Sequence, residues 1–313
     1  VTVSVEAIPE NQYAERLKQA KIDGTMPTVY QTEYASEDIQ RSAASVKSVY
    51  DSIDNLSDYY FLQTYRKSLV EEKEVPLGFN IPVVYVRRSD EVDASVFTMN
   101  TISDIMNAEY YLDSSYADIL INSLGGAYYY ANGLVLDDVS KEIIQDIVKH
   151  TKNDTKLGSN AKAMEGFTNG AVSYYLASVR ELQTFNKNVA GLYEMRPIES
   201  DTLCGQFTDA YSINGTAGKD EIAAAKVWLR YMLEEGPQKT YHLVHRHAIP
   251  LQKDAYRVYV DNNSKLYVID GYVDKLKFYP KNERKLEALT ESLWKQVVKE
   301  RTENIDEWCK EHE

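Results

Sequence analysis

Residues 167–180 place the strongest constraint on the fold of this chain. The segment turns at Gly170 and continues as a run of apolar and aromatic residues. Such a run after a turn is typical of a buried strand. We expect this strand to bring Ser178 and Arg180 to the edge of a sheet.

An amphipathic helix is predicted for residues 220–236. Apolar side chains recur at offsets of 0, 3, 7, 10 and 11 from Ile222, which places them on one helix face. Asp220 stands where a capping residue is expected, and Gly236 stands where the helix should end. A buried strand followed by a helix of this kind predicts an α/β fold.

The start of the chain has the pattern of a strand, a helix and a second strand. Residues 1–7 alternate between apolar and polar, Pro9 opens a helical pattern that closes near Gly24, and residues 27–32 predict the next strand. This order predicts one unit of a parallel sheet. Further along, we expect a strand at 83–86, a polar tail to Glu313, and helices at 36–72, 101–106, 115–123, 137–153 and 286–297.

Length and composition limit the function. A chain of 313 residues favours two lobes over one core. Its net charge of −13 argues against nucleic acid or an anionic membrane as a partner, because those surfaces attract Lys and Arg. Its 25 Tyr exceed its 7 Phe, and Tyr suits ligands with both apolar faces and hydroxyls, such as sugars. Most of these tyrosines are nevertheless expected to serve in packing.

The sequence offers no catalytic motif. It has neither a Gly-x-Ser-x-Gly elbow nor a glycine-rich phosphate loop, so we expect no enzyme activity and no cofactor. We interpret His242, His245 and His247 as the end of a helix rather than a metal site, since their spacing does not share one helix face. Cys204 and Cys309 lie far apart, and whether they pair stays open.

Four motifs, in this order, resemble the extracellular solute-binding proteins of ABC importers, in particular the sugar-binding branch called family 1. They lie at residues 76–87, 124–133, 167–170 and 219–238. The first is similar to the segment by which these proteins cross between lobes. The second is similar to a Gly-Gly turn, the third to a Phe-x-x-Gly turn, and the fourth to a return helix ending in Gln.

The resemblance implies the periplasmic-binding-protein-like type II fold, with a ligand cleft between two α/β lobes. It assigns 1–80 to lobe 1, 81–215 to lobe 2, 216–248 to a return helix in lobe 1, and 249–313 mainly to lobe 2. The family's usual first strand and helix are missing here. Because a gap in a sheet would leave backbone groups unpaired, we expect the missing piece to exist elsewhere.

The resemblance also implies ligand-binding positions, and each has a competing structural role such as packing or a salt bridge. The family's frequent Trp after the Phe-x-x-Gly strand is replaced by Val179, which leaves the sugar class open. The candidate residues are Thr32, Tyr34, Phe79, Asn80, Tyr128, Tyr129, Ser178, Arg180, Asp209, Tyr211 and Tyr279.

The implied function is capture of a small polar solute, expected to be an oligosaccharide, and its delivery to an ABC transporter permease. The protein would then be a monomer that is periplasmic or a cell-surface lipoprotein. A ligand-sensing ectodomain of a membrane signalling protein is the alternative of the same fold. A structural or adhesive surface protein without a ligand is the third hypothesis.

Overall fold

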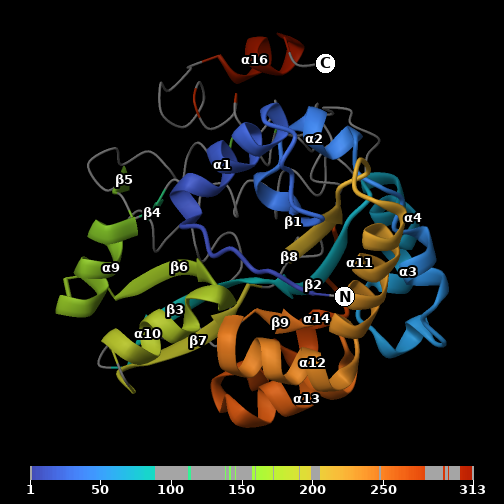
Figure 1. Cartoon of the computed structure of the whole chain (residues 1–313). Coiled ribbons are helices and arrows are strands. Elements are labelled where there is room, and N and C mark those ends of the chain that lie inside the picture. Colours follow the sequence, from blue (N-terminus) through green and yellow to red (C-terminus); the bar gives the residue numbers. More distant parts are fainter. Residues whose placement is uncertain are drawn as a thin grey trace. The chain divides into compact units, whose positions relative to one another are not determined.

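The computed structural model describes residues 2–88, 160–171, 173–189, 191–198, 205–246, 248–278 and 304–311, with isolated positions at 112–113, 138, 141, 145, 157–158, 292 and 295. The chain forms two compact units (Figure 1). Unit 1 comprises Val1–Phe79 and Phe207–Asn262, and unit 2 comprises Asn80–Gln206 and Asn263–Glu313. The chain therefore returns to unit 1 at Phe207, earlier than the boundary at 215/216 expected from the sequence.

A four-stranded sheet in the order β1-β8-β2-β9 is the centre of unit 1. β1 pairs antiparallel with β8, and β2 pairs antiparallel with β9. Its strands are β1 (Val29–Gln31), β2 (Val75–Asn80), β8 (Gln206–Ile213) and β9 (Ile249–Pro250), where the last residue of β2, Asn80, already belongs to unit 2. Its helices are α1 (Glu10–Ile22), η1 (Thr32–Tyr34), α2 (Glu37–Arg41), α3 (Lys47–Asp51), η2 (Leu56–Asp58), α4 (Leu62–Glu72), α11 (Lys219–Met232), α12 (Glu235–Thr240), η6 (Tyr241–Arg246) and α13 (Lys253–Asn262).

Helix α1 confirms the prediction made from its end signals. Pro9 stands at its N-cap, and Gly24 follows its end with a φ of 67° that suits glycine. The buried Leu17 packs with Tyr30 of β1 and Ile39 of α2. This apolar contact anchors α1 to the sheet.

The strand predicted for residues 1–7 is wrong. Residues 2–9 form neither helix nor strand, and Val3 and Val5 are 72% and 86% exposed. An alternating pattern makes a strand only where a neighbour supplies backbone hydrogen bonds, and in the sheet as described β1 pairs with β8 alone. The predicted parallel unit is also wrong, because residues 2–7 form no strand and β1 pairs antiparallel with β8.

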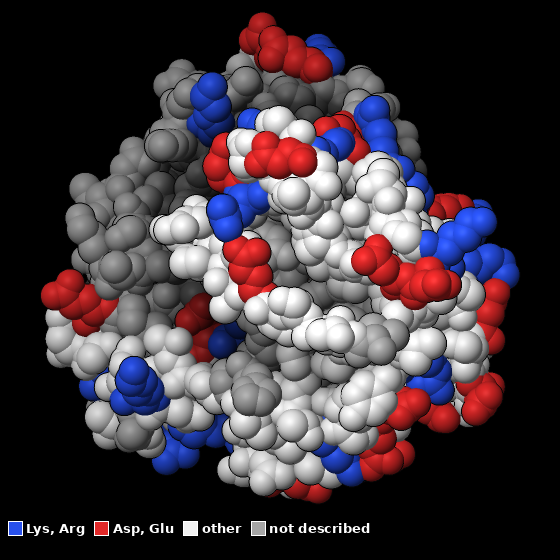
Figure 2. Space-filling view, in the orientation of Figure 1, with Lys and Arg blue, Asp and Glu red and all other residues white. Residues whose placement is uncertain are grey.

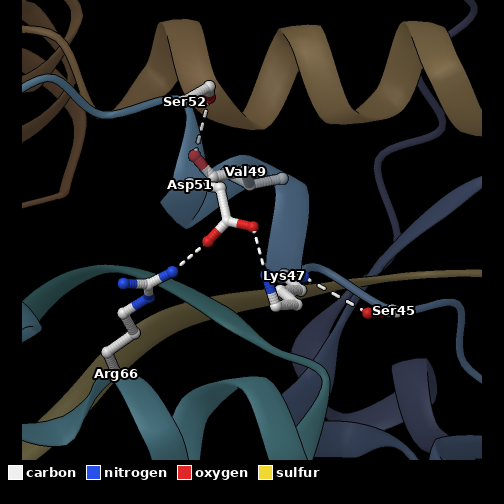
Figure 3. A network of polar contacts seen from close by, with 6 residues as sticks. All are labelled: Ser45, Lys47, Val49, Asp51, Ser52 and Arg66. Atoms are coloured by element: carbon white, nitrogen blue, oxygen red, sulfur yellow. Dashed lines mark hydrogen bonds and ion pairs between the residues drawn. The ribbon is translucent and has the colours of Figure 1, made fainter.

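Residues 36–72 are helical in four separate pieces, α2, α3, the short η2 and α4. Ile39, Val46 and Val49 are buried, as their spacing predicts. Helices α3 and α4 are joined at the surface by Asp51, which accepts from Lys47 at 2.5 Å and also from Arg66 (Figure 3). The hydrogen bond from Lys47 is the main cause that lowers the pKa of Asp51.

The helix predicted for residues 220–236 is α11, with corrected ends. Gly218 rather than Asp220 is the N-cap, and the side chain of Glu221 accepts from the amide of Gly218 at 2.8 Å. The helix ends at Met232, with Leu233 as its C-cap, so the expected stop at Gly236 is wrong; Gly236 lies inside the next helix, α12. Gly236 has an ordinary negative φ, which a helix interior accepts.

Unit 2 contains a three-stranded sheet in the order β6-β3-β7, with both neighbouring pairs antiparallel. β3 confirms the strand predicted at 83–86. The described strands are β3 (Pro82–Arg87), β4 (Leu112–Asp113), β5 (Leu157–Gly158), β6 (Tyr174–Ser178) and β7 (Tyr193–Pro197). The described helices are α9 (Asn160–Asn169), η5 (Val179–Glu181), α10 (Leu182–Asn188), η7 (Ser264–Ile269), α14 (Asp270–Val273) and α16 (Ile305–Glu311).

Aromatic rings form the core beside this sheet. Tyr85 of β3 stacks on Phe185 of α10 with ring centroids 3.9 Å apart and planes 3° apart. Phe167 packs edge-on against Phe185 at 5.1 Å. Phe167 thus lies in helix α9 and not in the turn expected there, although Gly170 does turn the chain, with a φ of 83°.

The predicted helices at 101–106, 115–123 and 286–297 lie outside the described residues, apart from isolated positions. Within 137–153, the described positions Asp138, Lys141 and Gln145 are helical. The expected polar tail contains helix α16, whose Trp308 and Cys309 are buried. Cys204 lies outside the described residues. Among the helices that the structure describes, none combines the length and apolar character needed to cross a membrane.

Candidate functional site

The clearest candidate site in unit 1 lies where β1 ends (Figure 1). The half-buried Tyr34 lies in the turn η1, and its ring centroid is 5.1 Å from that of Tyr13, with planes at 48°. The amide of Gln31 donates to the Tyr13 hydroxyl at 3.0 Å. Burial raises the pKa of Tyr13, so its hydroxyl stays neutral.

Asp209 lies inside β8 and has an unusual backbone. It is 8% exposed and has a φ of 52°, in the left-handed region. Its amide donates to Oε1 of Glu33 at 2.9 Å. This hydrogen bond links Asp209 of β8 to Glu33 in η1, the residue before Tyr34.

Tyr211 lies two residues further along β8 and contacts two other rings. Its hydroxyl oxygen is 3.2 Å from that of Tyr241, and its ring meets Trp228 of α11 edge-on at 5.6 Å. Because side chains alternate along a strand, Tyr211 is on the sheet face opposite Ser212. Ligand contacts by Tyr34, Asp209 and Tyr211 stay predictions.

Two other candidates of unit 1 are engaged in the core. The hydroxyl of Thr32 is 2.8 Å from that of Ser212, which in turn accepts from Gln40 Nε2 at 3.0 Å. Phe79 is fully buried and packs against Phe61, with ring centroids 5.1 Å apart. A ligand role for either residue stays a prediction.

In unit 2 the structure brings three candidates together. Asn80 is buried, and its Nδ2 donates to the Ser178 hydroxyl at 2.8 Å. Its Oδ1 accepts from the amides of Ile81 at 3.0 Å and Arg180 at 3.2 Å. The hydroxyl of Tyr85 also donates to the Ser178 carbonyl at 2.9 Å. The Asn80 amide thus fixes the backbone from which the Arg180 side chain extends.

Arg180 is exposed, in the short helix η5 that follows β6. A charge at the end of an apolar strand would be costly if it were buried, but solvent reaches this side chain. A guanidinium with a fixed backbone can donate several hydrogen bonds to a ligand. Ligand contacts by Asn80, Ser178 and Arg180 stay predictions.

Three candidates, Tyr128, Tyr129 and Tyr279, lie outside the described residues. Conversely, sequence reasoning missed Tyr13, Glu33 and Tyr241. Tyr13 lies within the segment predicted as the first helix, and no local pattern distinguishes it from a packing residue.

The charged side chains of the described part of the chain are mixed in sign and form no metal-binding group. Figure 2 shows Lys and Arg interspersed with Asp and Glu over the described part of the face in view. In the described ranges, no three His, Cys, Asp or Glu side chains form a group that could hold a metal. His242 is buried and donates from Nε2 to the Leu77 carbonyl at 2.6 Å, which is a structural role.

Residues 1–265 match the family model described as bacterial extracellular solute-binding protein. The chain belongs to this family. The match covers most of the chain, including all of unit 1. No curated protein sequence shows significant similarity to this member of the family.

Solved structures share the fold of this solute-binding protein. The sugar-binding protein MalE from Xanthomonas citri has a TM-score of 0.73 at 16% identity, over 99% of this chain and 88% of that one. The cyclic α-maltosyl-1,6-maltose binding protein from Arthrobacter globiformis has a TM-score of 0.73 at 12% identity, with the same coverage. UgpB from Mycobacterium tuberculosis, in complex with glycerophosphocholine, has 0.65 at 12% identity, over 97% and 88%. The expected α/β solute-binding fold is confirmed.

Proposed function

We propose that this solute-binding protein captures a carbohydrate and delivers it to the permease of an ABC importer. The observation that carries the proposal is the site at the end of β1. There, the amide of Asp209 donates to the carboxylate of Glu33, and the next residue, Tyr34, packs its ring against that of Tyr13. Carboxylates accept hydrogen bonds from sugar hydroxyls, and tyrosine rings suit the apolar faces of sugars.

Unit 2 supplies the second set of proposed contacts. Arg180 donates to ligand oxygens, and Asn80 holds its backbone in position. The similarity in fold to proteins described as sugar-binding supports a carbohydrate as the ligand. The family supports an extracellular location. We further propose attachment at the cell surface or a periplasmic location, and a monomeric state.

A thermal-shift screen tests the binding function. The full chain is heated with maltotriose, raffinose or xylotriose, with amino acids as controls. A sugar at 100 times its dissociation constant should stabilise the native state by about 2.7 kcal/mol. A cooperatively melting protein that responds to no sugar would refute the proposal.

Arg180→Ala should weaken binding of the sugar found in the screen. Loss of a charged hydrogen bond in a binding site costs about 1.5–3 kcal/mol, or roughly 10–150-fold in affinity. Arg257→Ala is the matched control, since Arg257 is an exposed arginine on α13. Equal affinities of the two variants, measured by calorimetry, would show that Arg180 does not contact the ligand. Delivery to a permease is tested separately, by sugar uptake in cells with and without the protein.

A further inference from the structure

The register of β1 and β8, continued beyond the strand, would place Glu33 opposite Asp209. The paired residues are Val29 with Ile213, Tyr30 with Ser212 and Gln31 with Tyr211. Two more steps of the same register would place residue 33 opposite residue 209. The chain leaves the strand at Thr32, however, and turns as η1.

In that turn it is the side chain of Glu33 that bonds to β8. Its Oε1 accepts the amide of Asp209 at 2.9 Å. In this antiparallel pair Thr28 accepts from the amide of Asn214, whereas the amide of Gln31 points away to Tyr13, so residues 29, 31 and 33 fall in non-hydrogen-bonded pairs. A longer β1 would therefore offer the Asp209 amide no backbone acceptor, and the Glu33 carboxylate supplies one through a charge-assisted hydrogen bond.

The conformation of Asp209 needs a reason that its local structure does not give. Lys73 also has a positive φ, of 58°, but it ends α4, and its amide bonds to the carbonyls of Leu69 and Val70, as at many helix ends. Asp209 lies inside a strand, where its φ of 52° ends no helix. Glycine would adopt this conformation without strain. Strained residues of this kind concentrate at functional sites.

We propose that Glu33 is a positioning residue, which holds Asp209 in its left-handed conformation so that the Asp209 carboxylate accepts a hydroxyl of a neutral carbohydrate. The inference rests on the proposed function. It also names the ligand's charge class. Glu33 and Asp209 bring two negative side chains to this site, linked through the Asp209 amide, and their charges repel an anionic group, so uronates and sugar phosphates are excluded.

Calorimetry on the full chain tests the proposal, with maltotriose, raffinose and xylotriose as neutral probes and trigalacturonate as the anionic probe. We expect a neutral probe to bind and trigalacturonate not to bind. Glu33→Gln keeps an oxygen acceptor, so its affinity for the neutral probe should stay within about twofold of that of the wild type. Glu33→Ala should bind about tenfold more weakly, which corresponds to about 1.4 kcal/mol. Glu15→Ala, an exposed glutamate of α1, is the control for the change of charge.

Two variants of Asp209 separate a ligand role from a structural one. Asp209→Gly should lose about 100-fold in affinity without lowering the melting temperature, because glycine relieves the strain. The affinity of Asp209→Asn for the neutral probe should be about tenfold lower than that of the wild type. Adding Glu33→Ala to Asp209→Asn should cause no further loss, since Glu33 acts through Asp209.

The outcomes distinguish this inference from the proposed function. Wild-type binding of a neutral probe with unchanged affinity of Glu33→Ala overturns the inference alone. Additive losses in the double variant do so as well, because Glu33 would then contact the ligand itself. If the wild type binds trigalacturonate as tightly as a neutral probe, the inference that the ligand is neutral is overturned. Failure of the wild type to bind any neutral probe overturns both proposals.

Discussion

Replacing Gln238 by methionine should strongly destabilise unit 1. Gln238 is fully buried and makes four hydrogen bonds to backbone groups. Its Nε2 donates to the carbonyls of Leu77 at 2.9 Å and Met232 at 3.0 Å. Its Oε1 accepts from the amides of Leu251 at 3.0 Å and Gln252 at 3.4 Å. One side chain thus joins β2, the end of α11 and the segment after β9.

Methionine has nearly the same shape as glutamine, so Gln238→Met removes the hydrogen bonds and leaves little cavity. A buried hydrogen bond contributes about 0.5–1.5 kcal/mol net, which gives about 2–6 kcal/mol for four. The Leu77 carbonyl keeps its bond to His242, while the amides of Leu251 and Gln252 lose this acceptor. We therefore expect a loss of about 4 kcal/mol in the free energy of unfolding.

Urea titration followed by circular dichroism measures this loss as a lower midpoint at an unchanged slope. Gln63→Met, on the exposed side of α4, is the matched control and should change stability by less than about 0.5 kcal/mol. A Gln238→Met variant within about 1 kcal/mol of the wild type would refute this account of the network.

Two further predictions concern unit 1. A Cβ at Gly215 would lie 2.1 Å from the backbone oxygen of Ser42, so Gly215→Ala should lower the free energy of unfolding by about 2 kcal/mol or more in urea titration; wild-type stability would contradict the close approach. The hydrogen bond from Lys21 lowers the pKa of Asp38 to about 2, so its stabilising effect is complete above about pH 4 and is lost as the pH falls towards 2. The urea midpoint of the wild type should therefore fall more steeply over this range than that of Asp38→Asn, and parallel curves would contradict the prediction.

Elements with local signals were predictable from the sequence. Pro9 and Gly24 mark the ends of α1, and the apolar run before Ser178 marks β6. The alternation in residues 1–7 failed because a strand needs a partner that the pattern does not reveal. Phe167 was misplaced because a motif of the related family outweighed the helical spacing around it.

The candidate site was predictable only in part. Asp209 and Tyr34 came from the resemblance to the family, and their contact with a ligand stays a prediction. Glu33 was missed because its hydrogen bond spans 176 residues and depends on the register of two distant strands. The left-handed backbone of Asp209 was also invisible, since aspartate carries no signal as strong as glycine does for that conformation.

The three passages of the chain between the units affect how the protein folds. Unit 1 is assembled from two stretches, and the contact between Thr32 and Ser212 joins residues 180 positions apart. Pairings this distant are slow to form, because a long loop must close before any contact compensates for its lost entropy. During synthesis, β1 and β2 stay unpaired until β8 and β9 emerge from the ribosome. A nascent chain stalled before Gln206 therefore exposes two unpaired strands, which makes it a substrate for chaperones and a starting point for aggregation.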